Sequence, residues 1–124
     1  MANRILILDD DTDILAICTY ILEEQGWEVL TSTNCNNIVE RVRQIAPQAI
    51  LMDNWIPDTG GIVATQALKN EDDLKHIPII YFSANNDIHT LARQARADTF
   101  LSKPFDINEL EGVINSVVPG AESA

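Results

Sequence analysis

The chain has 124 residues, the size of one ordinary domain, and a chain of this length buries roughly two-thirds of the surface that it exposes when unfolded. Hydrophobic residues make up 46% of the sequence, so a core can form without disulfides or a structural metal. The balance of 8 basic and 19 acidic residues gives a net charge of −11, which repels polyanions and argues against direct binding of nucleic acid.

Short apolar runs alternate with stretches in which apolar residues recur every three or four positions. The runs predict buried strands, and the recurring positions predict amphipathic helices. In chain order we predict a strand at 5–8, a helix at 14–22, a strand at 28–30, a helix from about 36 to 46, a strand at 49–52, a helix at 62–68, a strand at 79–82, a helix at 88–95, a weak strand at 99–101 and a helix from 106 to 118. Gly26 suits the end of the first helix, and Pro47 and Pro119 stop the second and the last.

This alternation predicts the fold class. Strands that alternate with helices pair in parallel, with helices on both faces and right-handed crossovers. We therefore predict an α/β fold, a five-stranded doubly wound parallel sheet in the flavodoxin-like order 2-1-3-4-5 with five helices on both faces. The sequence shows no linker or repeat, so we expect a single domain over residues 1–124, with its core at about 4–118 and a tail at 119–124.

The cysteines and the apolar runs also bear on where the protein works. Cys18 falls on the apolar face of the first predicted helix and shares no metal-ligand spacing with Cys35, which fits a reducing compartment. The first apolar run is too short for a signal peptide, and no stretch approaches the roughly 20 apolar residues of a membrane span. We expect a cytoplasmic location and no membrane segment.

Carboxylates follow two of the predicted strands. Asp53 comes directly after the strand at 49–52, and Asp9 and Asp10 follow the strand at 5–8. In the predicted order these strands are neighbours at the switch point, so their carboxyl ends border one crevice. Ionised carboxylates about 4 Å apart repel by roughly 1 kcal/mol in water and about 4 kcal/mol at an effective dielectric near 20. Such a group needs a cation or a raised pKa, and oxygen ligands with room for water and phosphate suit Mg²⁺ better than Ca²⁺.

The acidic run continues beyond the strand, with a different expected role. Asp11 and Asp13 stand where a helix begins, and acidic residues are favourable there. For these two we prefer a solvated turn and helix cap, an alternative that also exists for Asp9 and Asp10 but is weaker at the strand end.

Two further polar residues end strands at the same edge. Ser83 follows the fourth strand and can donate a hydrogen bond to a phosphoryl oxygen, and Lys103 follows the fifth and supplies a positive charge. Each is uninformative alone. Together with the carboxylates they suggest that Asp53 accepts a phosphoryl group.

From residue 4 to about 118 the chain resembles the receiver domain of two-component response regulators. The matching features are Asp9 and Asp10 after the first strand, Asp53 after the third, Pro57 and Gly61 four and eight residues later, Ser83, and the run Lys103, Pro104, Phe105. Each feature is weak, but this order at these strand ends is highly specific.

The resemblance implies a signalling phosphoacceptor rather than an enzyme. Asp53 would take its phosphoryl group from the phosphohistidine of a sensor histidine kinase or a phosphotransfer protein, and a downstream protein target would respond, with homodimerisation on phosphorylation left open. The implied site comprises Mg²⁺ held by Asp9, Asp10, Asp53 and the backbone carbonyl of Trp55; phosphate contacts from Lys103 and the backbone N–H of Ala84; and switch residues Ser83 and Phe100.

Several features depart from the family pattern, among them Gly60, which replaces the acidic residue frequent before Gly61. Arg96 stands where a glycine is usual, so a left-handed turn there would cost more free energy. The interval from Ser83 to Lys103 is shorter than usual, which predicts a shortened fourth helix or shortened loops. Phe100 lacks the hydroxyl of the tyrosine often found at its position, which leaves ring burial as a switch and core packing as the alternative.

Trp55 is an unusual neighbour for a metal site. Its side chain either shields the phosphorylated aspartate from water or is a loop side chain without effect. His76 and His89 lie in polar contexts and are expected to face solvent.

Other classes fit less well. A haloacid-dehalogenase-like phosphatase needs Asp-x-Asp-x-Thr, and Asp13 stands at the threonine position. An EF-hand loop that begins at Asp9 would need Gly and Glu where Ile14 and Tyr20 stand. A receiver that serves only as a binding surface is disfavoured, because all five site positions carry competent side chains.

Overall fold

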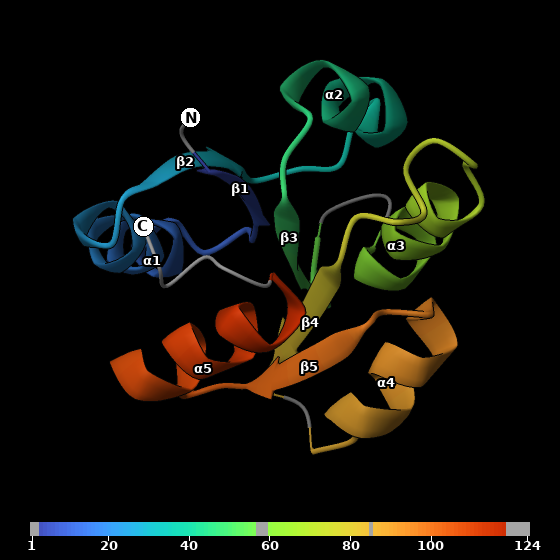
Figure 1. Ribbon diagram of the computed structural model, residues 1–124. Coiled ribbons are helices and arrows are strands. Elements are labelled where there is room, and N and C mark those ends of the chain that lie inside the picture. Colours follow the sequence, from blue (N-terminus) through green and yellow to red (C-terminus); the bar gives the residue numbers. More distant parts are fainter. Residues whose placement is uncertain (1–2, 57–59, 85, 119–124) are drawn as a thin grey trace.

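The computed structural model describes residues 3–56, 60–84 and 86–118, and in it a parallel sheet lies between two layers of helices (Figure 1). The strands of the described residues are β1 (Asn3–Leu8), β2 (Trp27–Ser32), β3 (Ala49–Asp53), β4 (Ile79–Ser83) and β5 (Thr99–Ser102). The helices are α1 (Thr12–Glu24), α2 (Ile38–Ile45), α3 (Gly61–Lys69), α4 (Ile88–Ala95) and α5 (Ile107–Val117). All strand pairs are parallel, in the order β2-β1-β3-β4-β5, which confirms the predicted fold class.

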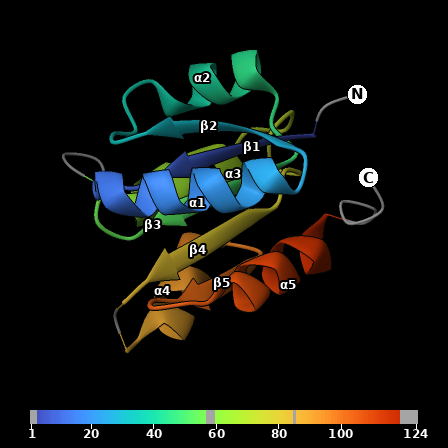
Figure 2. The same ribbon diagram turned by 90° about the vertical axis from the view of Figure 1, so that its left-hand side faces the viewer.

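The helices divide between the two faces of the sheet. Helices α1 and α5 cover one face and lie in front of the sheet in Figure 2, while α2, α3 and α4 cover the other. Every residue of β3 is buried: Ala49 and Leu51 pack toward α1 and α5, and Ile50 and Met52 pack toward α2 and α3. Because both faces are covered, the strand is a continuous apolar run that ends at a polar residue only where the sheet ends.

The predicted elements are all present, with small shifts at their ends. Strands β3 and β4 extend through Asp53 and Ser83, so both polar side chains belong to strands rather than to the following loops. Helix α2 begins at Ile38, later than predicted, because Asn37 has a left-handed backbone (φ 53°). Helix α4 is a short element of 8 residues. The Pro119–Gly120 stop and the tail lie outside the described residues.

The turn after α4 is left-handed even though Arg96 stands there in place of glycine. Arg96 has φ 65°, in a region where a side chain costs on the order of 1 kcal/mol. Its guanidinium donates to the Gln66 carbonyl at 3.3 Å and to the Asn70 side chain, and these bonds to α3 and the residue after it offset the cost.

Both cysteines are buried core residues with free thiols. Burial raises the pKa of the Cys18 and Cys35 thiols to about 11, so both stay protonated and unreactive at neutral pH. Among the described residues no helix combines the length and the apolar character that a membrane crossing requires.

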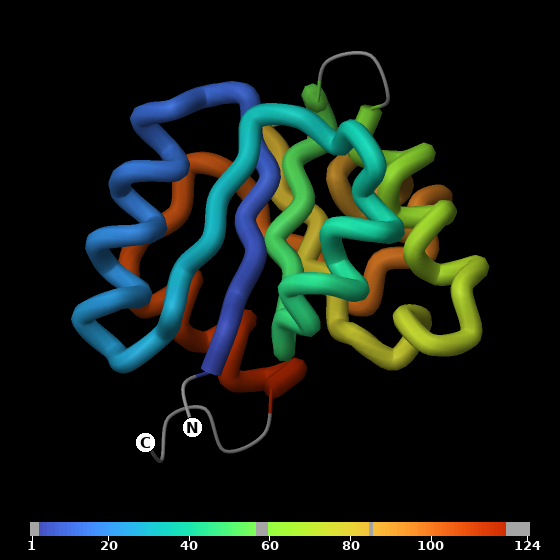
Figure 3. The backbone as a smooth tube through the Cα atoms, turned by 90° about the horizontal axis from the view of Figure 1, so that it is seen from above, coloured from blue at the N-terminus to red at the C-terminus, as the bar shows by residue number. Residues whose placement is uncertain are grey.

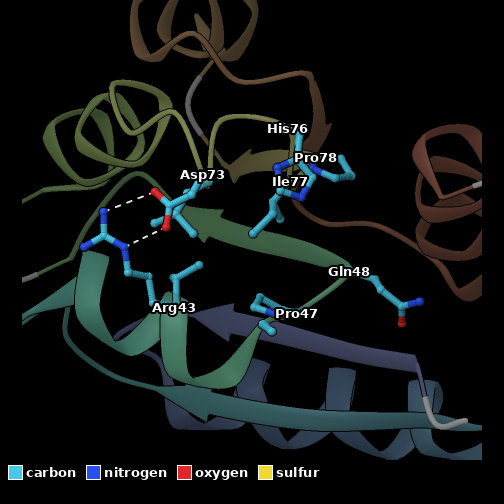
Figure 4. Close-up of a pocket in the computed structure, with 10 residues that line it drawn as sticks. Arg43, Pro47, Gln48, Asp73, His76, Ile77 and Pro78 are labelled. Carbon is cyan, nitrogen blue, oxygen red and sulfur yellow. Dashed lines mark hydrogen bonds and ion pairs between the residues drawn. The ribbon is translucent and has the colours of Figure 1, made fainter.

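A pocket lies at the amino ends of β3 and β4, between α2 and the segment before β4 (Figure 4). It encloses about 550 Å³, and Arg43 on its rim donates to Asp73 at 2.8 Å. Asp53 and Ser83 end the same two strands at the opposite edge of the sheet. The pocket is therefore separate from the carboxylate-bearing edge.

Candidate functional site

Three aspartates meet at the carboxyl edge of the sheet. Strands β1 and β3 run side by side, with Leu8 opposite Met52, and they end at the same edge (Figure 3). One carboxylate oxygen from each of Asp9, Asp10 and Asp53 lies within 4.8 Å of the others. Asp9 and Asp53 are buried, whereas Asp10 is exposed. The structure therefore brings together the three carboxylates that the strand order predicts at one crevice.

Lys103 joins two of these carboxylates. Its Nζ donates to Asp9 Oδ2 at 2.7 Å and to Asp53 Oδ1 at 2.8 Å. The ammonium also lies 4.6 Å from the centre of the Phe82 ring, and the Lys103 backbone N–H donates to the Ser83 carbonyl at 2.9 Å. These contacts hold one positive charge between two buried negative ones.

The pKa values of Asp53 and Lys103 follow from burial and from each other. Burial raises the pKa of Asp53, the hydrogen bond from Lys103 lowers it, and the charge of Asp9 raises it, with a net rise. Burial lowers the pKa of Lys103, but the hydrogen bonds to Asp53 and Asp9 outweigh that effect, so the pKa lies above its usual value. Lys103 is therefore charged at neutral pH, and this one ammonium contacts two of the three carboxylates.

The donor set of this site fits a hard divalent cation. All three side chains offer oxygen atoms, one of them on an exposed residue that solvent can reach. The single ammonium leaves negative charge uncompensated, and an oxygen-only cluster of this kind suits Mg²⁺.

The segment after Asp53 turns tightly against the end of β3. The backbone N–H of Trp55 donates to Asp53 Oδ2 at 3.0 Å, while Trp55 as a whole is 74% exposed. A Cβ at Gly61 would stand 2.1 Å from the Asp53 carbonyl oxygen, so only glycine fits where α3 begins. Pro57 lies outside the described residues.

The residues predicted for phosphate binding and switching occupy the ends of β4 and β5. Phe82 is the register partner of Asp53, so Ser83 lies one residue further along β4, where it is buried. Ala84 follows in an exposed bend. Phe100 is 37% exposed and packs edge-on against His89 of α4 with ring centres 5.5 Å apart. The core-packing alternative for Phe100 is therefore wrong.

Of the remaining acidic residues, Asp11 caps α1 and Asp13 lies in its first turn. Asp11 accepts hydrogen bonds from the backbone N–H groups of Asp13 at 2.9 Å and Ile14 at 3.4 Å. The backbone N–H of Asp11 donates in turn to Asp9 Oδ1 at 2.9 Å. The capping role predicted for Asp11 is confirmed, and the cap helps to orient Asp9. His76 and His89 are both exposed, as predicted.

Sequence reasoning missed the aromatic residues beside the site. Phe82 lies under the Lys103 ammonium, and the hydroxyl of Tyr81 donates to the side chain of Asn54. Both aromatics are part of the apolar run of β4, where a pattern of buried residues gives no sign of a polar contact.

Comparisons with known proteins agree over nearly the whole chain. Residues 5–115 match the family described as response regulator receiver domain. The chain is 33% identical over 107 residues to the CAI-1 autoinducer sensor kinase/phosphatase CqsS of Vibrio cholerae, covering 84% of this chain and 16% of CqsS. It is 27% identical over 124 residues to the polar-differentiation response regulator DivK of Brucella anthropi, covering 98% of this chain and 100% of DivK.

A solved structure shows the same fold. The receiver domain of sensor histidine kinase PA1611 from Pseudomonas aeruginosa, with a magnesium ion coordinated in its active site cleft, superimposes with a TM-score of 0.87 at 24% identity, covering 95% of this chain and 98% of that one. The chain spans only part of CqsS and the full length of DivK, so the shared unit is the receiver itself. By its sequence match and its fold, the chain belongs to the family of response regulator receiver domains.

Proposed function

We propose that Asp53 is the phosphoacceptor of a two-component system, and that residues 4–118 form the unit that carries out this role. Receiver domains are signalling phosphoacceptors, and this chain is one of them. The observation that carries the choice of residue is the position of Asp53: it ends β3 at the carboxyl edge, with Lys103 at 2.8 Å and two more carboxylates beside it. The donor is the phosphohistidine of a sensor histidine kinase or of a phosphotransfer protein.

The side chains present suit an attack by the Asp53 carboxylate. An oxygen of Asp53 forms a bond to phosphorus while the phosphorus–nitrogen bond of phosphohistidine breaks, and the imidazole nitrogen keeps the electron pair. Lys103 opposes the rise that burial causes in the pKa of Asp53, and its ammonium would pair with the arriving phosphoryl oxygens. The hydroxyl of Ser83 and the backbone N–H of Ala84 supply further donors at the end of β4.

Asp9, Asp10, Asp53 and the backbone carbonyl of Trp55 would hold Mg²⁺. The oxygen-only cluster and its uncompensated charge support this assignment, and the receiver of PA1611 holds magnesium in its cleft. When bound, the ion offsets the negative charge of the phosphoryl oxygens.

Phosphorylation would act on a protein-binding surface through Ser83 and Phe100. The modification adds a charge of about −1.5 to −2 at one point, which can draw the Ser83 hydroxyl toward the phosphoryl group. Phe100 is 37% exposed on the neighbouring strand β5, where a change in ring burial would alter the surface formed by α4 and β5. A downstream protein, or a second copy of the chain, would bind to the altered surface.

The experiment is intact-mass measurement after incubation with acetyl phosphate and Mg²⁺. We expect one phosphoryl adduct on the wild-type chain. The adduct should be absent when EDTA is present during the incubation, and absent in Asp53→Asn. Asp13→Asn, which removes a nearby carboxylate outside the metal cluster, should retain the adduct. An adduct that persists in Asp53→Asn would overturn the assignment of the phosphoacceptor.

Trp55→Ala tests whether the indole shields the phosphoryl group. We expect the dephosphorylation rate to stay within about twofold, because the contact between Trp55 and Asp53 is made by the backbone N–H and Trp55 is 74% exposed. The measurement is the decay of the adduct by intact mass. Decay several-fold faster than in the wild-type chain would instead support shielding.

A further inference from the structure

Tyr81 places a buried hydroxyl beside the residue that follows the phosphoacceptor. It lies in the middle of β4 with a fully buried side chain, and its hydroxyl donates to Asn54 Oδ1. Tyrosine in such a position usually needs a partner for its hydroxyl, because an unpaired polar group in the core is costly. The partner that the fold supplies is on the loop of the candidate site.

Asn54 is held at three of its atoms. Its backbone N–H donates to the Phe82 carbonyl at 3.3 Å, its carbonyl accepts from the Gly61 N–H at 3.2 Å, and its side chain accepts from Tyr81. The bonds reach β4 on one side and the start of α3 on the other. Asn54 thus ties the turn after Asp53 to two separate elements.

The Tyr81 hydroxyl keeps its proton at physiological pH. Burial and, to a lesser degree, the charge of Asp53 raise the pKa of the Tyr81 hydroxyl, which therefore stays protonated and remains a donor. The next residue along the chain from Asn54 is Trp55, whose N–H already bonds the Asp53 carboxylate. An anchored Asn54 fixes the start of the segment that orients this carboxylate.

We propose that Tyr81 and Asn54 are positioning residues for Mg²⁺ binding at the Asp53 site. Neither side chain touches the ion in this scheme. The hydrogen bond between the two side chains fixes the turn after Asp53, so the Asp53 carboxylate and the Trp55 carbonyl are already positioned to bind Mg²⁺. Mg²⁺ binding then does not have to order this turn. The inference rests on the proposed function, because it concerns the same metal site.

The test compares Mg²⁺ dissociation constants, measured by isothermal titration calorimetry, for the wild-type chain, Tyr81→Phe, Asn54→Ala and the double variant. We expect each single variant to bind Mg²⁺ roughly three- to tenfold more weakly, the effect of losing about one hydrogen bond. The double variant should bind no more weakly than Asn54→Ala, because both changes break the same contact. Tyr20→Phe, at an exposed tyrosine of α1, is the matched control and should bind as the wild-type chain does.

The free energy of unfolding in urea without Mg²⁺ separates positioning from mere stability. A purely structural role would lower this free energy and leave the dissociation constant of the folded protein unchanged, which would overturn the proposal. Additive effects in the double variant would overturn it as well. If the wild-type chain binds no Mg²⁺, the proposed metal site itself is wrong and the inference falls with it, whereas normal wild-type binding with an unaffected Tyr81→Phe rejects the inference alone.

Discussion

Lys103→Met is expected to lower the free energy of unfolding by about 3 kcal/mol when Mg²⁺ is absent. The ammonium lies 2.7 Å from Asp9 and 2.8 Å from Asp53, two buried carboxylates that would face each other without it. Methionine keeps most of the volume of the lysine stem over Phe82, so the loss reports the charge rather than a cavity. Urea unfolding of the wild-type chain and of Lys103→Met, both in EDTA, measures this loss of stability.

Mg²⁺ is expected to restore the stability of Lys103→Met, and this makes the prediction specific to the carboxylate site. A cation that binds only the folded chain stabilises it by RT ln(1 + [L]/Kd), so saturating Mg²⁺ should return much of the lost stability. Lys75→Met is the matched control. Its ion pair with Asp72 is exposed, so its removal should change stability by at most about 0.5 kcal/mol, with or without Mg²⁺. A Lys103→Met chain as stable in EDTA as the wild type would contradict the bridging role.

The loss of unfolding free energy caused by Lys103→Met should depend on pH in a defined direction. The raised pKa of Lys103 means that its stabilisation is fully present at neutral pH and is lost only as the pH rises through the folded-state value. Without the lysine, the pKa of Asp53, already raised by burial, rises further. A folded state that binds its proton more tightly than the unfolded chain gains stability as the pH falls. The deficit should therefore be smaller at pH 5 than at pH 7.

The sequence could predict the fold and the edge of the sheet because both depend on simple patterns. An apolar run that stops at a carboxylate predicts a strand with both faces covered by helices and a polar group at the end of that strand. Strand β3, which ends at Asp53, has this arrangement. The strand order then brings Asp9 next to Asp53. These conclusions need only the alternation of elements and the geometry of parallel sheets.

Contacts between side chains were beyond sequence reasoning. Tyr81 and Phe82 occupy neighbouring positions in an apolar strand, and only the packed structure shows that one hydroxyl reaches Asn54 and that one ring lies under Lys103. The start of α2 was missed for a local reason, the left-handed backbone of Asn37, which apolar periodicity does not register. The exposure of Phe100 depends on α4 packing beside β5.

Gly61→Ala is expected to destabilise the chain by about 2–3 kcal/mol and to slow phosphorylation of Asp53. The new methyl group would stand 2.1 Å from the Asp53 carbonyl oxygen and 3.1 Å from the Asn54 Cα, both backbone atoms that cannot rotate away. Either the amino end of α3 moves out or the turn after Asp53 shifts, and the second movement disturbs the carboxylate itself. Urea unfolding and the rate of adduct formation with acetyl phosphate measure the two effects.

Gly112→Ala gives the matched control for this close contact. Gly112 lies in α5, where an added methyl group would meet no atom within 4 Å apart from the nearby backbone of its own helix, so alanine there should raise stability by roughly 0.5–1 kcal/mol through helix propensity alone. The two substitutions add the same methyl group. Opposite changes in the free energy of unfolding would show that the destabilisation at Gly61 comes from the contact with the Asp53 carbonyl. Equal effects at both positions would mean that α3 does not approach the phosphoacceptor strand this closely in solution, and that the turn carrying Asn54 and Trp55 has more freedom than its hydrogen bonds indicate.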